Sequence, residues 1–145
     1  FEAARSAGAS QVFDYSSEGL ADQILEAAGG PTVDRIIEVE FGRNIDVNAA
    51  VIAEGGTIVS YGSAQVMTPT LPYYPLMFKA VTIELTLVYA LSPAARRVAI
   101  DRLNAMLERK ALDFRIGETL PLADCAKSHD LIAAGDRAGA VLLAI

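Results

Sequence analysis

The chain has 145 residues, of which 52% are hydrophobic, and this fraction excludes a largely disordered polypeptide and indicates a globular domain with a substantial core. Its formal net charge of -6 is spread along the sequence, which argues against a nucleic-acid partner. The longest apolar region, Leu76 to Leu91, is interrupted by Lys79 and Glu84, so we expect no membrane partner either. The single cysteine permits no internal disulfide, and with the single histidine it falls far short of a zinc ligand set, so we expect a cytoplasmic protein without a metal.

The first residues predict a helix, a strand and a second helix. Phe1 to Ala7 has a helical pattern with no cap ahead of it, which indicates a piece of a longer polypeptide. Gln11 to Tyr15 alternates between apolar and polar residues, as a short strand does. Ser17 is expected to cap a helix over Leu20 to Ala28, which Gly29 would close.

The next stretch predicts a strand–helix–strand unit. Apolar residues from Val33 to Val39 and from Ile58 to Tyr61 predict the two strands. The apolar residues between these runs recur at helical spacing, so they predict a connecting helix. Asn44 or Asp46 is expected to cap this helix, and Gly55-Gly56 to end it. Two strands joined in this way must be parallel, so the sequence predicts an α/β fold with an open parallel sheet flanked by helices.

Ligands of such sheets bind beyond the carboxyl ends of the strands, which here are Glu38 to Gly42 and Tyr61 to Ala64. Paired carboxylates such as Glu38 and Glu40 are a pattern for acid/base chemistry, but we interpret them as structural or solvated. The glycines that follow these strands have a similarly ordinary explanation, because glycine commonly ends a parallel strand.

The remaining sequence predicts further elements in chain order. A proline-rich passage around Pro72 is expected to be an ordered loop with at most one helical turn. Val81 to Leu91 is a predicted strand, and Ser92-Pro93 should cap a long helix that ends near Lys110. The last third predicts three elements: an extended segment at Phe114 to Leu120, a helix at Asp124 to Ala134 and a buried strand at Ala138 to Ile145.

Several spaced motifs carry a resemblance that runs the length of the chain. They are GASQVFDY, GGPTVDRIIEVEFG, VIAEGGTIVSYGS and the ending DCAKSHDLIAAG followed by AGAVLLAI. Together they resemble the medium-chain dehydrogenase/reductase superfamily, and within it the zinc-free quinone oxidoreductases related to zeta-crystallin. The resemblance implies a partial Rossmann-type parallel sheet that lacks its first two strands in residues 1–112, and in residues 113–145 a C-terminal segment that returns to a GroES-like catalytic domain.

The same resemblance implies a function. The parent protein would be an NADPH-dependent oxidoreductase that transfers hydride to a small quinone or enone, with no metal and no covalent catalysis by residues of this chain. The glycine-rich phosphate loop of the family is missing from the sequence, so the chain alone is expected to be inactive. Two alternatives stay open: a relative of the zinc-type alcohol dehydrogenases, and a non-catalytic self-association module.

Candidate cofactor-binding residues follow from matching positions in the family. Tyr15 corresponds to a tyrosine beside the 2′-phosphate of NADPH, although it is equally explained as a half-buried tyrosine at a strand end. Val88 and Tyr89 correspond to a segment near the nicotinamide, which is also explained by core or dimer packing. The full set of implied cofactor-binding residues is Tyr15, Glu40, Phe41, Gly42, Tyr61, Gly62, Ser63, Val88, Tyr89 and Arg137, and it contains no catalytic residue and no metal ligand.

Loss of two strands would leave Gln11 to Tyr15 without its usual neighbour in a Rossmann sheet. We therefore expect this segment to pair with Val33 to Val39, or a second chain to supply that pairing. The resemblance further implies a homodimer, formed through the sheet edge at Thr82 to Val88.

Overall fold

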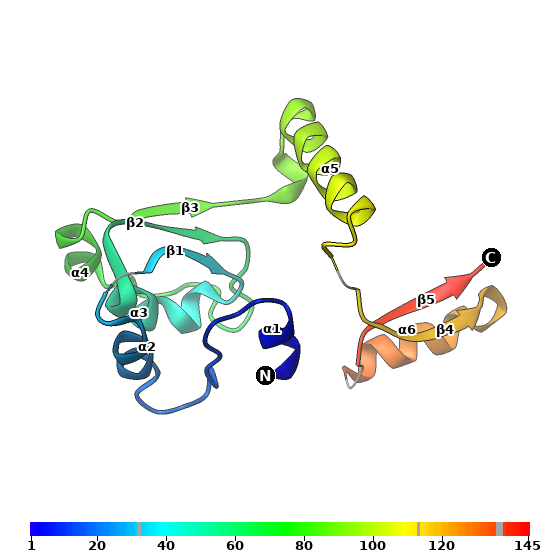
Figure 1. Cartoon of the computed structure of the whole chain (residues 1–145), viewed down its shortest axis with the longest axis horizontal. Helices are drawn as coiled ribbons and strands as arrows, with labels where there is room; N and C mark the ends of the chain where they lie inside the picture. The colour runs from blue at the N-terminus through cyan, green and yellow to red at the C-terminus, as the bar shows by residue number, and fades with distance from the viewer. Residues whose placement is uncertain (32, 113, 136–137) are drawn as a thin grey trace. The chain divides into compact units, whose positions relative to one another are not determined.

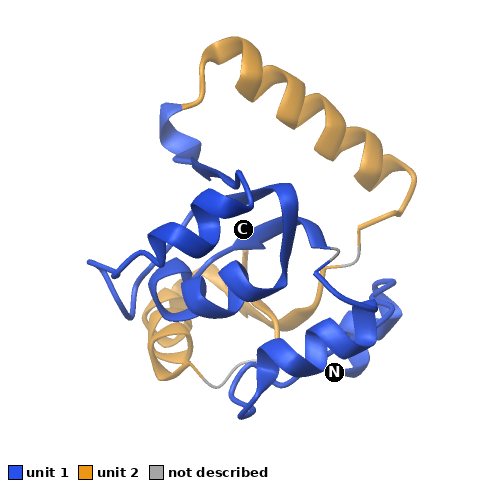
Figure 2. Ribbon diagram, turned by 90° about the vertical axis from the view of Figure 1, so that its left-hand side faces the viewer, with its two compact units in different colours: residues 1–90 blue, residues 91–145 orange. Residues whose placement is uncertain are grey.

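The computed structural model describes residues 1–31, 33–112, 114–135 and 138–145. The chain divides into two compact units, residues 1–90 and residues 91–145 (Figure 2). Each unit contains parallel strands with helices beside them, which confirms the predicted α/β class. In the described part of the chain, no helix is both long and apolar enough to cross a lipid bilayer.

The sheet of unit 1 has the order β1-β2-β3, and both pairings are parallel (Figure 1). Its strands are β1 (Val33–Glu38), β2 (Ile52–Ser60) and β3 (Thr82–Leu85). Ile36, Ile58 and Ile83 occupy matching positions across the three strands, so they lie on one face of the sheet. The helices of this unit are α1 (Glu2–Ser6), α2 (Leu20–Ala28), α3 (Phe41–Val51) and α4 (Tyr73–Phe78).

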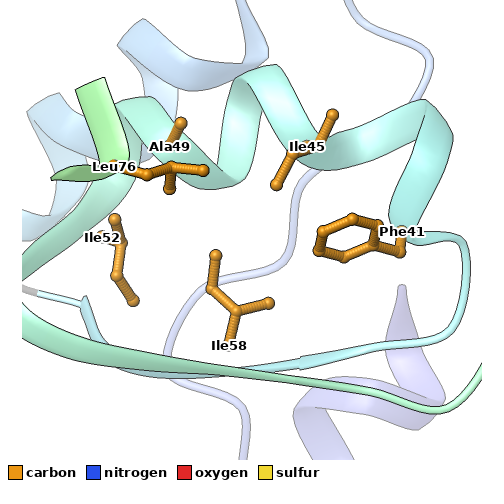
Figure 3. Close-up of a cluster of buried hydrophobic side chains, with 6 residues drawn as sticks. All are labelled: Phe41, Ile45, Ala49, Ile52, Ile58 and Leu76. Carbon is orange, nitrogen blue, oxygen red and sulfur yellow. The ribbon is translucent and has the colours of Figure 1, made fainter. Parts of the chain in front are cut away.

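The core of unit 1 lies between α3, α4 and the sheet (Figure 3). Its buried side chains are Phe41, Ile45 and Ala49 from α3, Ile52 and Ile58 from β2, and Leu76 from α4. Ile52 and Ile58 are fully buried, and burial of each stabilises the fold by roughly 1.5–3 kcal/mol. The parallel pairing of β1 with β2 places the carboxyl ends of these two strands beside each other.

The bounds of α3 differ from the prediction at both ends. The helix begins at Phe41 after Glu40, so the expected cap at Asn44 or Asp46 is wrong. It ends at Val51, and Gly55-Gly56 lies within β2. A long-range contact explains the early end, because the Lys79 ammonium donates to the carbonyl oxygens of Ala49, Ala50 and Ile52 at 2.8, 2.9 and 2.9 Å.

Three predictions for the first residues are also wrong. Gln11 to Tyr15 forms no strand, and β1 pairs with β2 alone among the described residues, so the expected pairing of that segment with β1 does not occur. The alternative, in which a second chain supplies the pairing, stays a prediction. The alternation of apolar and polar residues did not suffice to form a strand here, because a strand also requires a neighbouring strand to hydrogen-bond its main chain. The helix α2 has the predicted bounds and closes at Gly29, but Gly19 rather than Ser17 precedes it.

The third strand is shorter than predicted. β3 ends at Leu85, and Val88–Ala90 forms a short 3₁₀ helix, η1, in place of a continued strand. The edge expected at Thr82 to Val88 is therefore limited to Thr82–Leu85. The proline-rich passage leads into α4, which tolerates Pro75 because this residue lies in its first turn.

Unit 2 contains a long helix and a second strand–helix–strand unit. The helix α5 (Pro93–Glu108) begins as predicted, with the Ser92 hydroxyl accepting a hydrogen bond from the Ala95 N–H at 3.2 Å. The strands β4 (Ile116–Pro121) and β5 (Ala140–Ala144) pair in parallel, and η2 (Leu122–Asp124) and α6 (Cys125–Ala134) connect them. β5 was expected to be buried, but most of its side chains are exposed.

Candidate functional site

The candidate site lies where the parallel strands of unit 1 end. Main-chain hydrogen bonds join the two loops there: the Tyr61 N–H donates to the Glu38 carbonyl, and the Phe41 N–H donates to the Gly62 carbonyl, each at 3.0 Å. A pocket of about 270 Å³ opens beside them, lined by Ser60, Tyr61, Gly62, Ser63, Leu85, Thr86 and Leu87. An open pocket therefore lies at the edge that was predicted to bind a ligand.

The two glycines of these loops are required by close main-chain approach. A Cβ atom on Gly42 would overlap the Val66 carbonyl oxygen, and a Cβ on Gly62 would lie 2.5 Å from the Val39 carbonyl oxygen. The Gly42 N–H also donates to the Ser63 hydroxyl at 2.9 Å. Neither glycine has a positive φ, so they are explained by space rather than by backbone conformation.

The buried carboxylate of Glu38 holds the first of these loops through hydrogen bonds. Glu38 is 5% exposed, and its Oε1 accepts from the Glu40 N–H at 2.6 Å and from the Asn44 amide at 3.1 Å. Its Oε2 accepts from the Asn48 amide at 2.8 Å. These three donors satisfy a charge that burial alone would destabilise, and they tie the end of β1 to α3. This is the structural role predicted for Glu38.

Glu40 is oriented differently and contacts the other loop. Its Oε1 accepts from the Gln65 N–H at 2.7 Å, and its Oε2 accepts from the Ala64 N–H at 3.1 Å. One carboxylate thus holds two successive main-chain N–H groups that lie 24 and 25 positions further along the chain. The paired carboxylates of the sequence are both occupied by protein donors, which argues against acid/base work.

Tyr15 is part of a surface cluster at the same edge. The Arg43 guanidinium lies over the Tyr15 ring, 5.4 Å from its centroid, and donates to the Gln65 side-chain oxygen at 3.1 Å. Tyr15 lies within a tight turn in which the Ser16 hydroxyl and N–H both donate to Asp14. These bonds lower the pKa of the Asp14 carboxyl, with the hydroxyl making the larger contribution.

The predicted residues fall into four groups. Tyr15, Glu40, Gly42, Tyr61, Gly62 and Ser63 lie at the strand ends, linked by the contacts above. Phe41 is 8% exposed and its side chain packs in the core, so it does not face a ligand at the strand ends (Figure 3). Val88 and Tyr89 are exposed residues of η1. Arg137 lies outside the described residues.

The start of α3 does not offer a phosphate site. Helix N-termini bind phosphate through main-chain N–H groups that have no partner within the helix. Here the N–H groups of Phe41 and Gly42 donate to Gly62 and Ser63, and those of Arg43 and Asn44 donate to the Glu40 carbonyl. The first four N–H groups of α3 therefore all have partners within the protein.

Sequence reasoning missed several residues of this site: Arg43, Asn44, Asn48 and Gln65. Asn48 could have been found, because its position in the helical pattern lies on the buried side of the helix, and a buried amide requires a polar partner. The pairing of Arg43 with Gln65 had no such signal, because 22 positions separate them. Within the described ranges, no cluster of three or more histidine, cysteine, aspartate or glutamate side chains forms a metal site.

Parallel strands, flanking helices and glycine-containing strand-end loops define a dinucleotide-binding type of α/β domain. A family profile described as zinc-binding dehydrogenase matches residues 1–105, so the chain belongs to this family of the medium-chain dehydrogenase/reductase superfamily. The resemblance inferred from the motifs is thereby confirmed at the level of the superfamily.

Individual relatives agree with this assignment. The chain is 27% identical over 143 residues to a quinone oxidoreductase of Pseudomonas aeruginosa, a match that covers 97% of this chain and 44% of the relative. A mycobacterial quinone oxidoreductase structure has a TM-score of 0.86 at 23% identity, covering 99% of this chain and 45% of that one. A mycobacterial protein complexed with NADPH has a TM-score of 0.76 at 22% identity, covering 99% and 45%. The chain thus spans less than half the length of these proteins.

Proposed function

We propose that this chain forms the strand-end half of the cofactor site in an NADPH-dependent oxidoreductase, which passes hydride from the nicotinamide to a small quinone or enone. The observation that carries the proposal is the joined pair of loops at Glu38–Gly42 and Tyr61–Ser63, where glycines allow main chain to approach closely. The family assignment and the named quinone oxidoreductases support the reaction, and the NADPH complex of a structural neighbour supports the cofactor.

The residues present suit one part of the dinucleotide. Tyr61, 56% exposed, and the pocket beside Gly62 and Ser63 offer apolar and main-chain contacts to a flat ring. Tyr15 and Arg43 offer a phenol and a cation to a phosphate oxygen at the same edge. The N–H groups at the start of α3 are already bonded, so the pyrophosphate would be held by a preceding part of a longer polypeptide.

When bound, NADPH would supply the hydride, and the chain would bind and orient it without covalent chemistry or a metal. We also propose a cytoplasmic location and a homodimer. Support for the dimer comes from β3, which lies at one edge of the described sheet of unit 1 and so can pair with its counterpart in a second copy.

An NADPH titration tests the proposal. The 145-residue chain is compared with a chimera in which the preceding part of the Pseudomonas aeruginosa relative is joined to it. We expect NADPH to raise the Tm of the chimera by roughly 2 to 4 °C or more, because ligand binding to the folded state raises its stability. No shift in either protein would refute a cofactor-binding role.

A pair of tyrosine variants locates the contact. Tyr61→Ala removes an exposed ring at the strand ends, whereas Tyr73→Ala removes a ring of similar exposure, 60% against 56%, on α4. α4 precedes β3, so it lies toward the opposite end of the strands. We expect Tyr61→Ala to weaken NADPH binding and Tyr73→Ala to leave it unchanged; equal effects would contradict the proposed location.

A further inference from the structure

The contact between Glu40 and the loop at residues 63–66 joins two parts of the candidate site that are distant in sequence. Both carboxylate oxygens accept main-chain N–H groups, from Gln65 at 2.7 Å and from Ala64 at 3.1 Å. Such charge-assisted bonds are about twice as strong as bonds between neutral groups. Ala64 and Gln65 are themselves exposed, so packing contributes little to fixing this turn.

The effect of Glu40 extends beyond the turn that it holds. Gln65 presents its side-chain oxygen to the Arg43 guanidinium, and that guanidinium lies over the Tyr15 ring. A continuous series of contacts therefore runs from Glu40 through Gln65 and Arg43 to Tyr15. On the other side of the turn, Ser63 accepts from the Gly42 N–H, which brings the same loop against the start of α3.

The position of this carboxylate is unusual for a site that receives an anion. A negative charge beside a phosphate-bearing cofactor opposes binding by ordinary electrostatics. A fold that needed nothing more than a short turn has uncharged means of forming one, such as a hydroxyl or an amide side chain. We therefore explain the charge of Glu40 by the turn at Ala64 and Gln65, which it holds in place.

We propose that Glu40 is a positioning residue of the cofactor site. Its carboxylate fixes the turn at Ala64 and Gln65, so that the main chain of Gly62 and Ser63 and the stacked pair of Tyr15 and Arg43 form one preformed surface. The inference rests on the proposed function and deepens it, because it assigns the order of the binding surface to one side chain that does not itself contact the reacting atoms.

Three variants separate order from charge. Glu40→Gln keeps the shape, removes the charge and leaves a single oxygen to accept two N–H groups. Glu40→Asp keeps the charge but is one methylene shorter, so it cannot reach both N–H groups. Asp46→Asn is the matched control, because it removes one negative charge from an exposed position on α3, the helix that follows Glu40.

The first measurement is hydrogen exchange of the Ala64 and Gln65 amides in the 145-residue chain, which needs no ligand. We expect Glu40→Gln to speed exchange of both amides about tenfold or more, because the charge that assists both bonds is lost, and Glu40→Asp to speed exchange of at least one of them to a similar extent. Asp46→Asn should leave both rates unchanged. Wild-type exchange rates in the Glu40 variants would overturn the proposal.

The second measurement is the Kd for NADPH in the chimera described above. Positioning predicts about tenfold weaker binding for Glu40→Gln and Glu40→Asp, and unchanged or slightly tighter binding for Asp46→Asn. If Glu40 acted only as a nearby charge, Glu40→Gln would bind NADPH more tightly, and this outcome would overturn the proposal. Looser amides with wild-type affinity in both Glu40 variants would also overturn it, because the role would then be local to the turn.

Failure of the proposed function has a different signature. In that case wild-type chimera binds no NADPH while the exchange rates still respond to Glu40, and the positioning role toward the cofactor is refuted together with the function. Binding by the wild type with no response to either Glu40 variant refutes the positioning role alone.

Discussion

The Asn48 amide donates a 2.8 Å hydrogen bond to Oε2 of Glu38, and the two side chains are only 6% and 5% exposed. A buried carboxylate is stable in a fold when hydrogen bonds replace its lost hydration. Here the amide comes from the middle of α3 and the carboxylate from the last residue of β1. This buried hydrogen bond therefore joins α3 to the end of β1 next to the candidate site.

Glu38→Ala should lower the free energy of unfolding of unit 1 by about 3 kcal/mol, because it leaves buried donors without an acceptor. Tyrosine emission in urea denaturation measures this, since all five tyrosines lie in residues 1–90 and the chain has no tryptophan. Glu54→Ala, at an exposed position of β2, should change stability by less than about 0.5 kcal/mol. A loss of under about 1 kcal/mol for Glu38→Ala would contradict the prediction.

Lys79→Met should lower the stability of unit 1 by about 2 kcal/mol. The ammonium donates to the carbonyls of Ala49, Ala50 and Ile52, and each such bond from a charged donor is worth more than a neutral one. Lys127→Met is the control: its exposed ion pair with Glu118 lies in unit 2, so urea denaturation followed by tyrosine emission should show no change for unit 1. Equal effects in the two variants would show that the carbonyl contacts contribute little.

Gly42→Ala should destabilise unit 1 by about 1–3 kcal/mol and displace the loop at residues 63–66, because its Cβ would overlap the Val66 carbonyl. Gly55→Ala is a useful comparison, since its φ of +70° is strained for alanine while its surroundings are open. Amide chemical shifts should change at Val66 and Ser63 in the first variant and stay unchanged in the second. Unchanged shifts at Val66 in Gly42→Ala would refute the steric explanation.

Ser16→Ala should raise the pKa of Asp14 toward its ordinary value of 3.8, because it removes the hydroxyl that lowers it most. A carboxyl with a lowered pKa stabilises the folded state above its unfolded pKa, and this contribution is lost as the pH falls through the lowered, folded-state value. The wild-type turn should therefore open only at the more acidic end of an NMR titration, and the Tyr15 resonances should report it. Identical titration curves for the wild type and Ser16→Ala would contradict the assignment.

The sequence predicted the helix ends that are set by residues next to them in the chain. The helix Leu20–Ala28 was located by its apolar spacing and by Gly29, which adopts the left-handed conformation with φ of 75°. The start of α5 followed from Ser92 and Pro93, and the hydroxyl of Ser92 does accept the expected bond. Neighbouring residues alone determine these features, so a single sequence contains them.

Features that depend on distant contacts were not predictable. The end of α3 at Val51 depends on an ammonium 27 to 30 positions away, and the glycine pair that should have ended the helix continues into β2. Gln11 to Tyr15 had the alternation of a strand but no neighbour to pair with. In the site, strand-end positions and glycines were predictable from topology, whereas the partners of Glu40 were not, because nothing near it in sequence points to Ala64 and Gln65.

The open side of β1 has a consequence for the behaviour of the folded chain in salt. Among the described residues β1 pairs on one side only, so its other side is available to strands of neighbouring molecules, while a net charge of -6 keeps those molecules apart. Added salt weakens the repulsion without weakening main-chain hydrogen bonds. The colloidal stability of this protein should therefore fall as ionic strength rises, with turbidity developing from native molecules rather than from unfolded ones.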